Sequence, residues 1–276
     1  MRIFISADME GITGLVDAED VQPGGRDYER GRLAMTEDVN AAVRGAVRAG
    51  ATEIVVNDAH GPMRNLRTEI LDPAARLIRG KPKAMGMIEG LTADFDALIC
   101  VGYHSRAGAH GVLSHSFMGH EIEDMWLDDR PTGEIGLVQA SAAALGVPLV
   151  ALTGDDAACQ EAADWAPGVA TVPVKYVRGR FAAELRPENE AHAAIEETVA
   201  TSLAAPRTAI APSEETATLA VRWQSSTVAH TLLGIPNVTA VDPRTVKAVS
   251  TPPDLFRQFG VWMRVASSLT NQAPYC

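Results

Sequence analysis

Two acidic side chains follow the first apolar run of the chain, and their types and spacing could support metal or acid–base chemistry. Asp8 and Glu10 come directly after residues 2–7, a short apolar run that predicts a buried strand. Because side chains alternate between faces along a strand, both carboxylates should point the same way. Neighbouring carboxylates repel, so one takes up a proton or a cation lies between them. Two solvated acids at a loop entrance are the alternative.

Three further side chains that can bind a metal follow other predicted elements. His60 and His104 each come just after a predicted strand, and Glu134 opens a predicted helix. In a parallel sheet the carboxyl ends of the strands meet at one edge, where ligands bind. We therefore expect these groups, and Asp155 with them, to converge on the acidic pair. The four predicted strands cover residues 2–7, 53–57, 97–101 and 149–152.

Such a set of groups suits a catalytic metal site. Three carboxylates and two imidazoles exceed what one tetrahedral ion needs, and they fit two ions roughly 3.5–4 Å apart that share a carboxylate. Asp8, placed directly at the strand end, is the expected bridge. Mixed oxygen and nitrogen ligands favour Zn²⁺, with Mn²⁺ or Co²⁺ as substitutes.

Each residue also has a simpler interpretation. Glu134 could stabilise a helix N-terminus, His60 could belong to a turn, and His104 could donate to a backbone carbonyl. The shared position at strand ends argues against all three being true together. His115 is the best further acid–base candidate, with a plain loop histidine as the alternative. The remaining histidines of this region, His110 and His120, are interpreted as loop residues.

The elements that must position these groups predict an α/β protein. Strands and helices alternate at a spacing typical of a three-layer fold, a mostly parallel sheet with helices on both faces. One helix is expected over 36–48, with Thr36 as its N-cap. We expect an α/β metal-binding catalytic domain at 1–165 and a smaller C-terminal α+β subdomain at 166–276 that closes the pocket or mediates assembly. Beyond residue 165 the expected strands cover 169–177, 219–223, 227–232 and 238–241, and the expected helices cover 187–203 and 251–269.

Composition narrows the function further. The 276 residues carry 24 Lys and Arg against 35 Asp and Glu, a net charge of −11, which disfavours nucleic acid and anionic membranes as partners. No stretch has the length of a transmembrane helix or the core of a signal peptide. Cys100, Cys159 and Cys276 form no CxxC pair, so we expect a reduced, cytoplasmic protein without disulfides. Neither a GxSxG elbow nor a phosphate-binding GxxxxGK[ST] loop is present.

At the residues described so far, the chain resembles the zinc-dependent D-aminopeptidase family, the self-compartmentalising peptidases of dipeptide-transport operons. The resemblance is closest over residues 1–165. It implies two Zn²⁺ per subunit held by Asp8, Glu10, His60, His104 and Glu134, with His115 as the catalytic histidine. It also implies a ring-stacked homo-oligomer, with a decamer as one candidate, whose active sites face an internal chamber. The matching segments are 6–11 (SADMEG), 57–60 (NDAH), 102–106 (GYHSR), 114–116 (SHS) and 129–134 (DRPTGE).

The function expected from these residues and this resemblance is a dinuclear zinc aminopeptidase. It would hydrolyse short peptides with an N-terminal D-residue of the D-Ala type, through water activated by the metal. Asp155 or Asp156 could recognise the free amino group. The alternatives are a two-metal hydrolase of another amide or of a phosphate ester, with Arg106 or Arg130 as the cation for the phosphate, or a non-catalytic metal-binding module.

Overall fold

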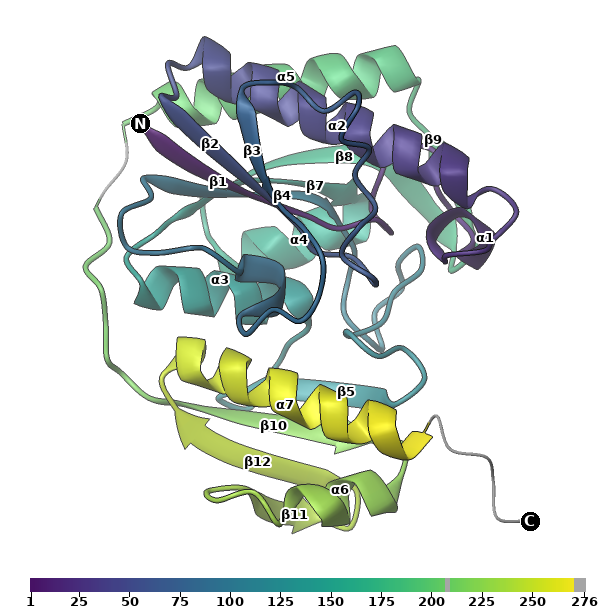
Figure 1. The fold of residues 1–276 in the computed structure, drawn as a ribbon, viewed down its shortest axis with the longest axis vertical. Coiled ribbons are helices and arrows are strands. Elements are labelled where there is room, and N and C mark those ends of the chain that lie inside the picture. Colours follow the sequence, from purple (N-terminus) through teal and green to yellow (C-terminus); the bar gives the residue numbers. More distant parts are fainter. Residues whose placement is uncertain (207–208, 271–276) are drawn as a thin grey trace.

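A computed structural model describes residues 1–206 and 209–270, and its centre is a seven-stranded sheet (Figure 1). Six neighbouring strands run parallel, and the last two form an antiparallel hairpin at one edge. The central strands are buried on both faces, which explains why they appear in the sequence as continuous apolar runs. The strand order is β3 (Ala75–Ile78), β2 (Glu53–Asp58), β1 (Arg2–Ala7), β4 (Ala97–Tyr103), β7 (Leu149–Asp155), β8 (Ala170–Gly179), β9 (Ala182–Leu185).

Helices cover both faces of this sheet. On one face, α2 (Tyr28–Arg48) and α5 (Glu188–Ala204) pack beside each other, and Ile3 and Ile5 of β1 point toward them. On the other face lie α3 (Glu134–Ala144) and α4 (Asp156–Trp165), and Phe4 belongs to that core. The period-two alternation of a strand thus supplies two separate cores from one run of residues. The expected three-layer architecture is confirmed.

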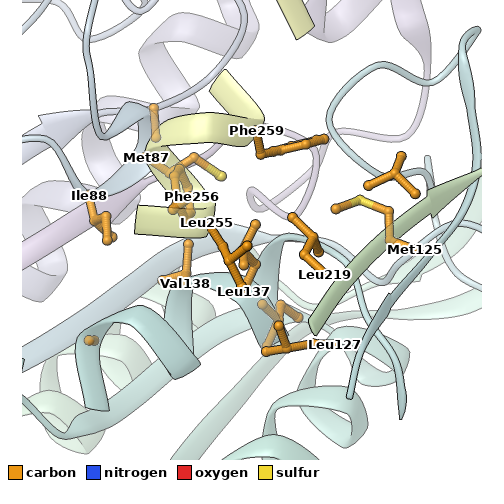
Figure 2. Packing of buried hydrophobic residues seen from close by; sticks show 14 of the residues in the cluster. Met87, Ile88, Met125, Leu127, Leu137, Val138, Leu219, Leu255, Phe256 and Phe259 are labelled. Carbon is orange, nitrogen blue, oxygen red and sulfur yellow. The ribbon is translucent and has the colours of Figure 1, made fainter. Parts of the chain in front are cut away.

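A second, antiparallel sheet of five strands lies beyond the α3 face. Between the two sheets runs α7 (Pro252–Thr270), whose apolar side chains meet those of α3, the short 3₁₀ turn at Gly86–Ile88 and strands of the second sheet (Figure 2). This shared core joins the two sheets into one body. The second sheet has the order β11 (Thr239–Asp242), β12 (Thr245–Ser250), β10 (Ala217–Trp223), β5 (Ile122–Leu127), β6 (Arg130–Pro131); the short helices are α1 (Ala18–Val21) and α6 (Ser226–Leu232).

Two local predictions are wrong. Helix α2 begins at Tyr28 instead of residue 36, and Thr36 lies inside it, where its hydroxyl donates to Arg32 O at 2.8 Å instead of capping. Residues 227–232, expected as a strand, form α6, because Ser225 caps that helix by accepting from Thr227 N at 3.2 Å.

The sheets do not divide the chain at residue 165. β8, β9 and α5 follow that residue yet complete the first sheet and its helical layer, whereas β5 and β6 precede it yet pair in the second sheet. The division into domains at 1–165 and 166–276 stays a prediction. Cys100 and Cys159 are buried free thiols, and Cys276 lies outside the described residues. Within 1–206 and 209–270, no helix combines the length and apolarity needed to cross a membrane.

Candidate metal centre

The five predicted metal-binding side chains meet at the carboxyl edge of the central strands. His60 Nδ1 lies 3.4 Å from Asp8 Oδ1 and 3.0 Å from Glu10 Oε2. His104 Nε2 lies 3.5 Å from Asp8 Oδ2 and 3.3 Å from Glu134 Oε1. Both contacts place Asp8 between the two imidazoles, so the convergence expected from the strand ends is present in the fold.

His115 lies at the side of this cluster. Its ring stacks on that of His104, with centroids 4.2 Å apart and planes 9° from parallel. Its Nε2 is 3.9 Å from Glu10 Oε1 and 4.0 Å from Glu134 Oε1. A second tie comes from Phe117, whose backbone N–H donates to Glu134 Oε1 at 2.7 Å. The loop that carries His115 is therefore fixed directly to the cluster.

The loop that carries Asp8 and Glu10 is held by close backbone contacts. Asp8 N donates to Val101 O and Gly11 N donates to Gly102 O, both at 2.8 Å. A Cβ on Gly11 would lie 1.9 Å from Tyr103 O, so only glycine permits this approach of the loop after β1 to the end of β4.

Lys175, on β8, holds the same loop through hydrogen bonds to its backbone carbonyls. Its side chain is fully buried, and its Nζ donates to Glu10 O at 2.6 Å, Ile12 O at 3.0 Å and Leu15 O at 2.5 Å. Burial lowers the pKa of this ammonium group to about 8. Three carbonyl acceptors use all three of its hydrogens, so the residue acts as an internal support for the chain around Glu10.

Backbone carbonyls fix the orientation of each imidazole. His60 Nε2 is 2.9 Å from Val21 O, His104 Nδ1 is 3.0 Å from Ser105 O, and His115 Nδ1 is 2.8 Å from Leu113 O. A carbonyl oxygen only accepts, so each of these nitrogens carries the hydrogen. The other ring nitrogen of each histidine therefore faces the cluster with a lone pair whenever the ring is neutral, which is the orientation that metal-binding histidines require.

The electrostatics of the cluster call for a cation. Burial, together with Glu10 and Glu134, raises the pKa of Asp8 to about 7. Burial opposes the charged form of Glu10 as well, but His60 holds its pKa well below the usual range. Asp8 Oδ2 and His104 Nε2 are buried and make no hydrogen bond. Unsatisfied buried groups of this kind are costly unless an ion lies between them.

The possible ligand atoms form three overlapping triplets, each with its atoms within 4.8 Å of one another. Asp8, Glu10 and His104 each belong to two of them. Overlap through a shared carboxylate is the arrangement expected for two neighbouring ions. The triplets are Asp8, Glu10 and His60; Asp8, His104 and Glu134; and Glu10, His104 and His115.

A cavity of about 400 Å³ opens onto the cluster. Apolar side chains line it from several segments, among them the segment after His115 and helix α7. Cationic side chains also line it. The apolar members include Phe117, Met118, Phe256 and Met263, and the cationic ones are Lys81, Lys83 and Arg264.

Several other candidates from the sequence lie elsewhere. Asp155 does not line the cavity: its carboxylate caps α4 by accepting from Ala158 N and also accepts from Val112 N, both at 2.7 Å. Asp156 Oδ1 accepts from Val177 N at 2.8 Å. The suggested role of these acids in binding the amino group therefore lacks geometric support.

The arginines suggested for a phosphate are also placed elsewhere. Arg106 donates to Ala107 O at 2.9 Å, and the guanidinium of Arg130 lies 3.8 Å from the centre of the Trp165 ring. Neither lines the cavity. His110 and His120 are exposed, as expected for loop histidines. Sequence reasoning missed Lys175 and the cationic wall, because isolated Lys and Arg residues form no motif.

A buried carboxylate–imidazole cluster that opens onto a cavity at the carboxyl edge of an α/β sheet defines a metallohydrolase-type site. Residues 1–259 match the family model described as D-aminopeptidase, and the chain belongs to that family. The predicted class, a hydrolase acting on peptide bonds, is thereby confirmed.

Sequence similarity and structural similarity both agree with this assignment. A D-aminopeptidase of Bacillus subtilis strain 168 is 44% identical over 182 residues, which span 66% of this chain and 66% of that protein. The solved structure of the Zn-dependent D-aminopeptidase DppA from Bacillus subtilis, described as a self-compartmentalizing protease, matches with a TM-score of 0.90 at 32% identity. That match covers 100% of both chains.

Proposed function

We propose that this chain is a dinuclear zinc aminopeptidase that hydrolyses short peptides with an N-terminal D-residue of the D-Ala type. The observation that carries the proposal is the position of Asp8, which belongs to two of the possible ligand triplets at once. Family membership and the zinc dependence of the Bacillus subtilis relative support the choice of metal and substrate.

Five residues are the proposed ligands. Asp8, Glu10 and His60 Nδ1 would hold one zinc ion, and Asp8, His104 Nε2 and Glu134 would hold the other. The unpartnered Asp8 Oδ2 and His104 Nε2 fit this assignment, since both need a partner that the protein itself does not supply. When bound, the ions would supply Lewis-acid chemistry that activates water and polarises the scissile carbonyl.

His115 is the proposed catalytic histidine. Its Nδ1 hydrogen is held by Leu113 O, so the proton it handles must be at Nε2. Burial and the neighbouring His104 lower its pKa, which keeps the ring neutral and able to accept. It would take a proton at Nε2 and then donate it to the leaving amine nitrogen, or stabilise the developing oxyanion once protonated. The triplet with Glu10 and His104 offers His115 a competing role as a third ligand.

The assembly belongs to the proposal as well. The self-compartmentalizing character of the relative suggests a homo-oligomer, built as stacked rings with active sites facing a chamber. Exposed large apolar side chains on two separate edges, among them Phe181 and Leu185 of the β9 region and Val241 and Val249 of the second sheet, are consistent with contacts between copies. Light scattering of the purified protein measures the number of subunits directly.

The experiment that tests the function pairs metal analysis with hydrolysis. The protein is purified, its zinc is measured, and D-Ala-D-Ala, L-Ala-L-Ala and a generic phosphate ester are assayed before and after chelation. We expect close to two zinc ions per chain and chelator-sensitive cleavage of the D-peptide alone. Cleavage of the phosphate ester in place of the peptide would contradict the substrate class, and one zinc per chain would contradict the dinuclear site.

A further inference from the structure

The cavity above the cluster has a cationic wall that the proposed chemistry does not use. Lys81 and Lys83 lie on the segment between β3 and the 3₁₀ turn, and Arg264 lies on α7. Arg264 Nη2 donates to Lys83 O at 3.4 Å, which brings the two segments together. Three basic side chains from two distant parts of the sequence thus line the same cavity, in a protein whose net charge is −11.

Lys83 has a structural role. It is buried, and its Nζ donates to Asn57 Oδ1 at 2.7 Å, Asp58 O at 2.6 Å and Ile78 O at 3.4 Å. These acceptors use all its hydrogens and tie the segment to the end of β2. The ammonium group of Lys83 is therefore fully hydrogen-bonded to the protein and is not available to a ligand.

Lys81 and Arg264 are placed differently, because the ammonium group of Lys81 and most of the Arg264 guanidinium are not taken up by protein acceptors. No ion pair within 1–206 and 209–270 includes either residue. Both are exposed at the cavity, and burial, together with the charge of Arg264, lowers the pKa of Lys81. Two cationic side chains that line one cavity and form no ion pair favour the binding of an anion there.

The rest of the cavity indicates which anion. The proposed zinc cluster would bind the reacting amide and the N-terminal end of a substrate, and the apolar wall of Phe117, Met118, Phe256 and Met263 suits aliphatic side chains. A short peptide at neutral pH carries a carboxylate at its other end. The cavity therefore presents a group for each part of such a molecule.

We propose that Lys81 and Arg264 bind the free C-terminal carboxylate of the peptide substrate. This inference rests on the proposed function and deepens it: the substrate class becomes short peptides with a free carboxyl end, and longer or amidated peptides are discriminated against. A guanidinium and an ammonium group on one carboxylate form charge-assisted hydrogen bonds, the strong kind.

A binding experiment tests the inference without relying on catalysis. Metal-free protein is titrated in a calorimeter with D-alanyl-D-alanine and with its C-terminal amide, using wild type, Lys81→Met, Arg264→Met and the double variant. We expect the wild type to prefer the acid by about tenfold and each single variant to lose most of that preference. The double variant should lose little more than either single one, because both cations share one carboxylate.

Controls separate this effect from a general change of charge. Lys247→Met makes the same substitution on exposed β12, outside the cavity, and should keep the preference for the acid. Equal affinity of the wild type for acid and amide, or no binding of either, overturns the inference, and so does a preference that survives in both single variants. Inorganic phosphate that binds more tightly than the peptide, and is lost in the same variants, overturns the carboxylate assignment.

Hydrolysis by the zinc-loaded protein distinguishes a failure of the proposed function from a failure of the carboxylate site. If the acid binds with the expected preference but neither peptide is cleaved, the proposed function fails and the anion site stands. If both peptides are cleaved with the same KM, the function stands and the carboxylate site fails. With both correct, the variants raise KM for the acid about tenfold and change kcat little.

Discussion

At the scale of single residues, the candidate site depends on how each imidazole is held. His60, His104 and His115 each present one nitrogen to a backbone carbonyl and the other to the cluster. The positions of strand ends identified Asp8, Glu10, His60 and His104, whereas Glu134 was expected at the start of a helix and His115 in a loop, with its catalytic role implied by the family resemblance. The sequence contains no signal for the carbonyl partners, since any residue supplies a carbonyl. Ring orientation therefore had to come from the structure.

Replacement of His115 by Ala separates its two possible roles. Because Nε2 is placed to transfer a proton, we expect His115→Ala to keep its zinc while kcat falls by roughly 10²-fold or more. Zinc analysis and steady-state kinetics on D-Ala-D-Ala provide the measurement, with exposed His110→Ala as the matched control. A loss of one zinc ion would instead make His115 a ligand.

Replacement of Lys175 by Met tests the internal support of the β1 loop. The change removes the donor that Glu10 O, Ile12 O and Leu15 O share, and only Ile12 O keeps another, Leu15 N at 3.3 Å. We expect the free energy of unfolding to fall by about 2–4 kcal/mol, and zinc to be released at lower chelator concentration than from wild type. Denaturant unfolding and a chelator titration measure these, and Lys247→Met should change neither. Unaltered zinc retention would contradict the supporting role.

At the scale of helices and strands, local patterns predicted most elements, and the error at residues 227–232 has a clear cause. Thr227, Val228 and Thr231 have β-branched side chains, which favour a strand by propensity, yet the cap at Ser225 and the buried Val228 and Leu232 make the segment helical. The pairing of β5 with β10 could not be predicted, since it depends on contacts between distant segments.

Helices α2 and α5 offer a prediction about pH. His192 on α5 lies 3.1 Å from Asp38 Oδ1 on α2, and this contact raises the pKa of the histidine. A raised pKa in the folded state stabilises the protein fully below the unfolded value of about 6.5, and the contribution disappears as the pH rises through the folded value.

We therefore expect His192→Gln to lower the melting temperature more at pH 5.5 than at pH 8.5, with a free energy difference below about 1 kcal/mol. Thermal melts of both proteins at the two pH values measure it, with exposed His110→Gln as control. A gap that widens toward pH 8.5 would contradict the contact.

At the scale of the whole molecule, the cluster lies at the carboxyl ends of the central strands. The two large apolar cores lie on the two faces of the sheet, away from the cluster. Metal removal should therefore abolish hydrolysis and lower the melting temperature, because an ion that binds only the folded state stabilises it. The far-ultraviolet circular dichroism should stay unchanged, and added Zn²⁺ should restore activity. Collapse of the helical signal on chelation would indicate a metal that builds the fold.

The pairing of β5 with β10 has a consequence for biosynthesis. The N–H of Thr218 donates to Asp128 across 90 positions of the chain, and Glu134 follows directly on this part of the second sheet. While the polypeptide emerges from the ribosome, β5 can pair only with the two-residue strand β6 until β10 has been translated. Peptide cleavage would then begin only after most of the polypeptide has emerged, so an incomplete nascent chain has no activity.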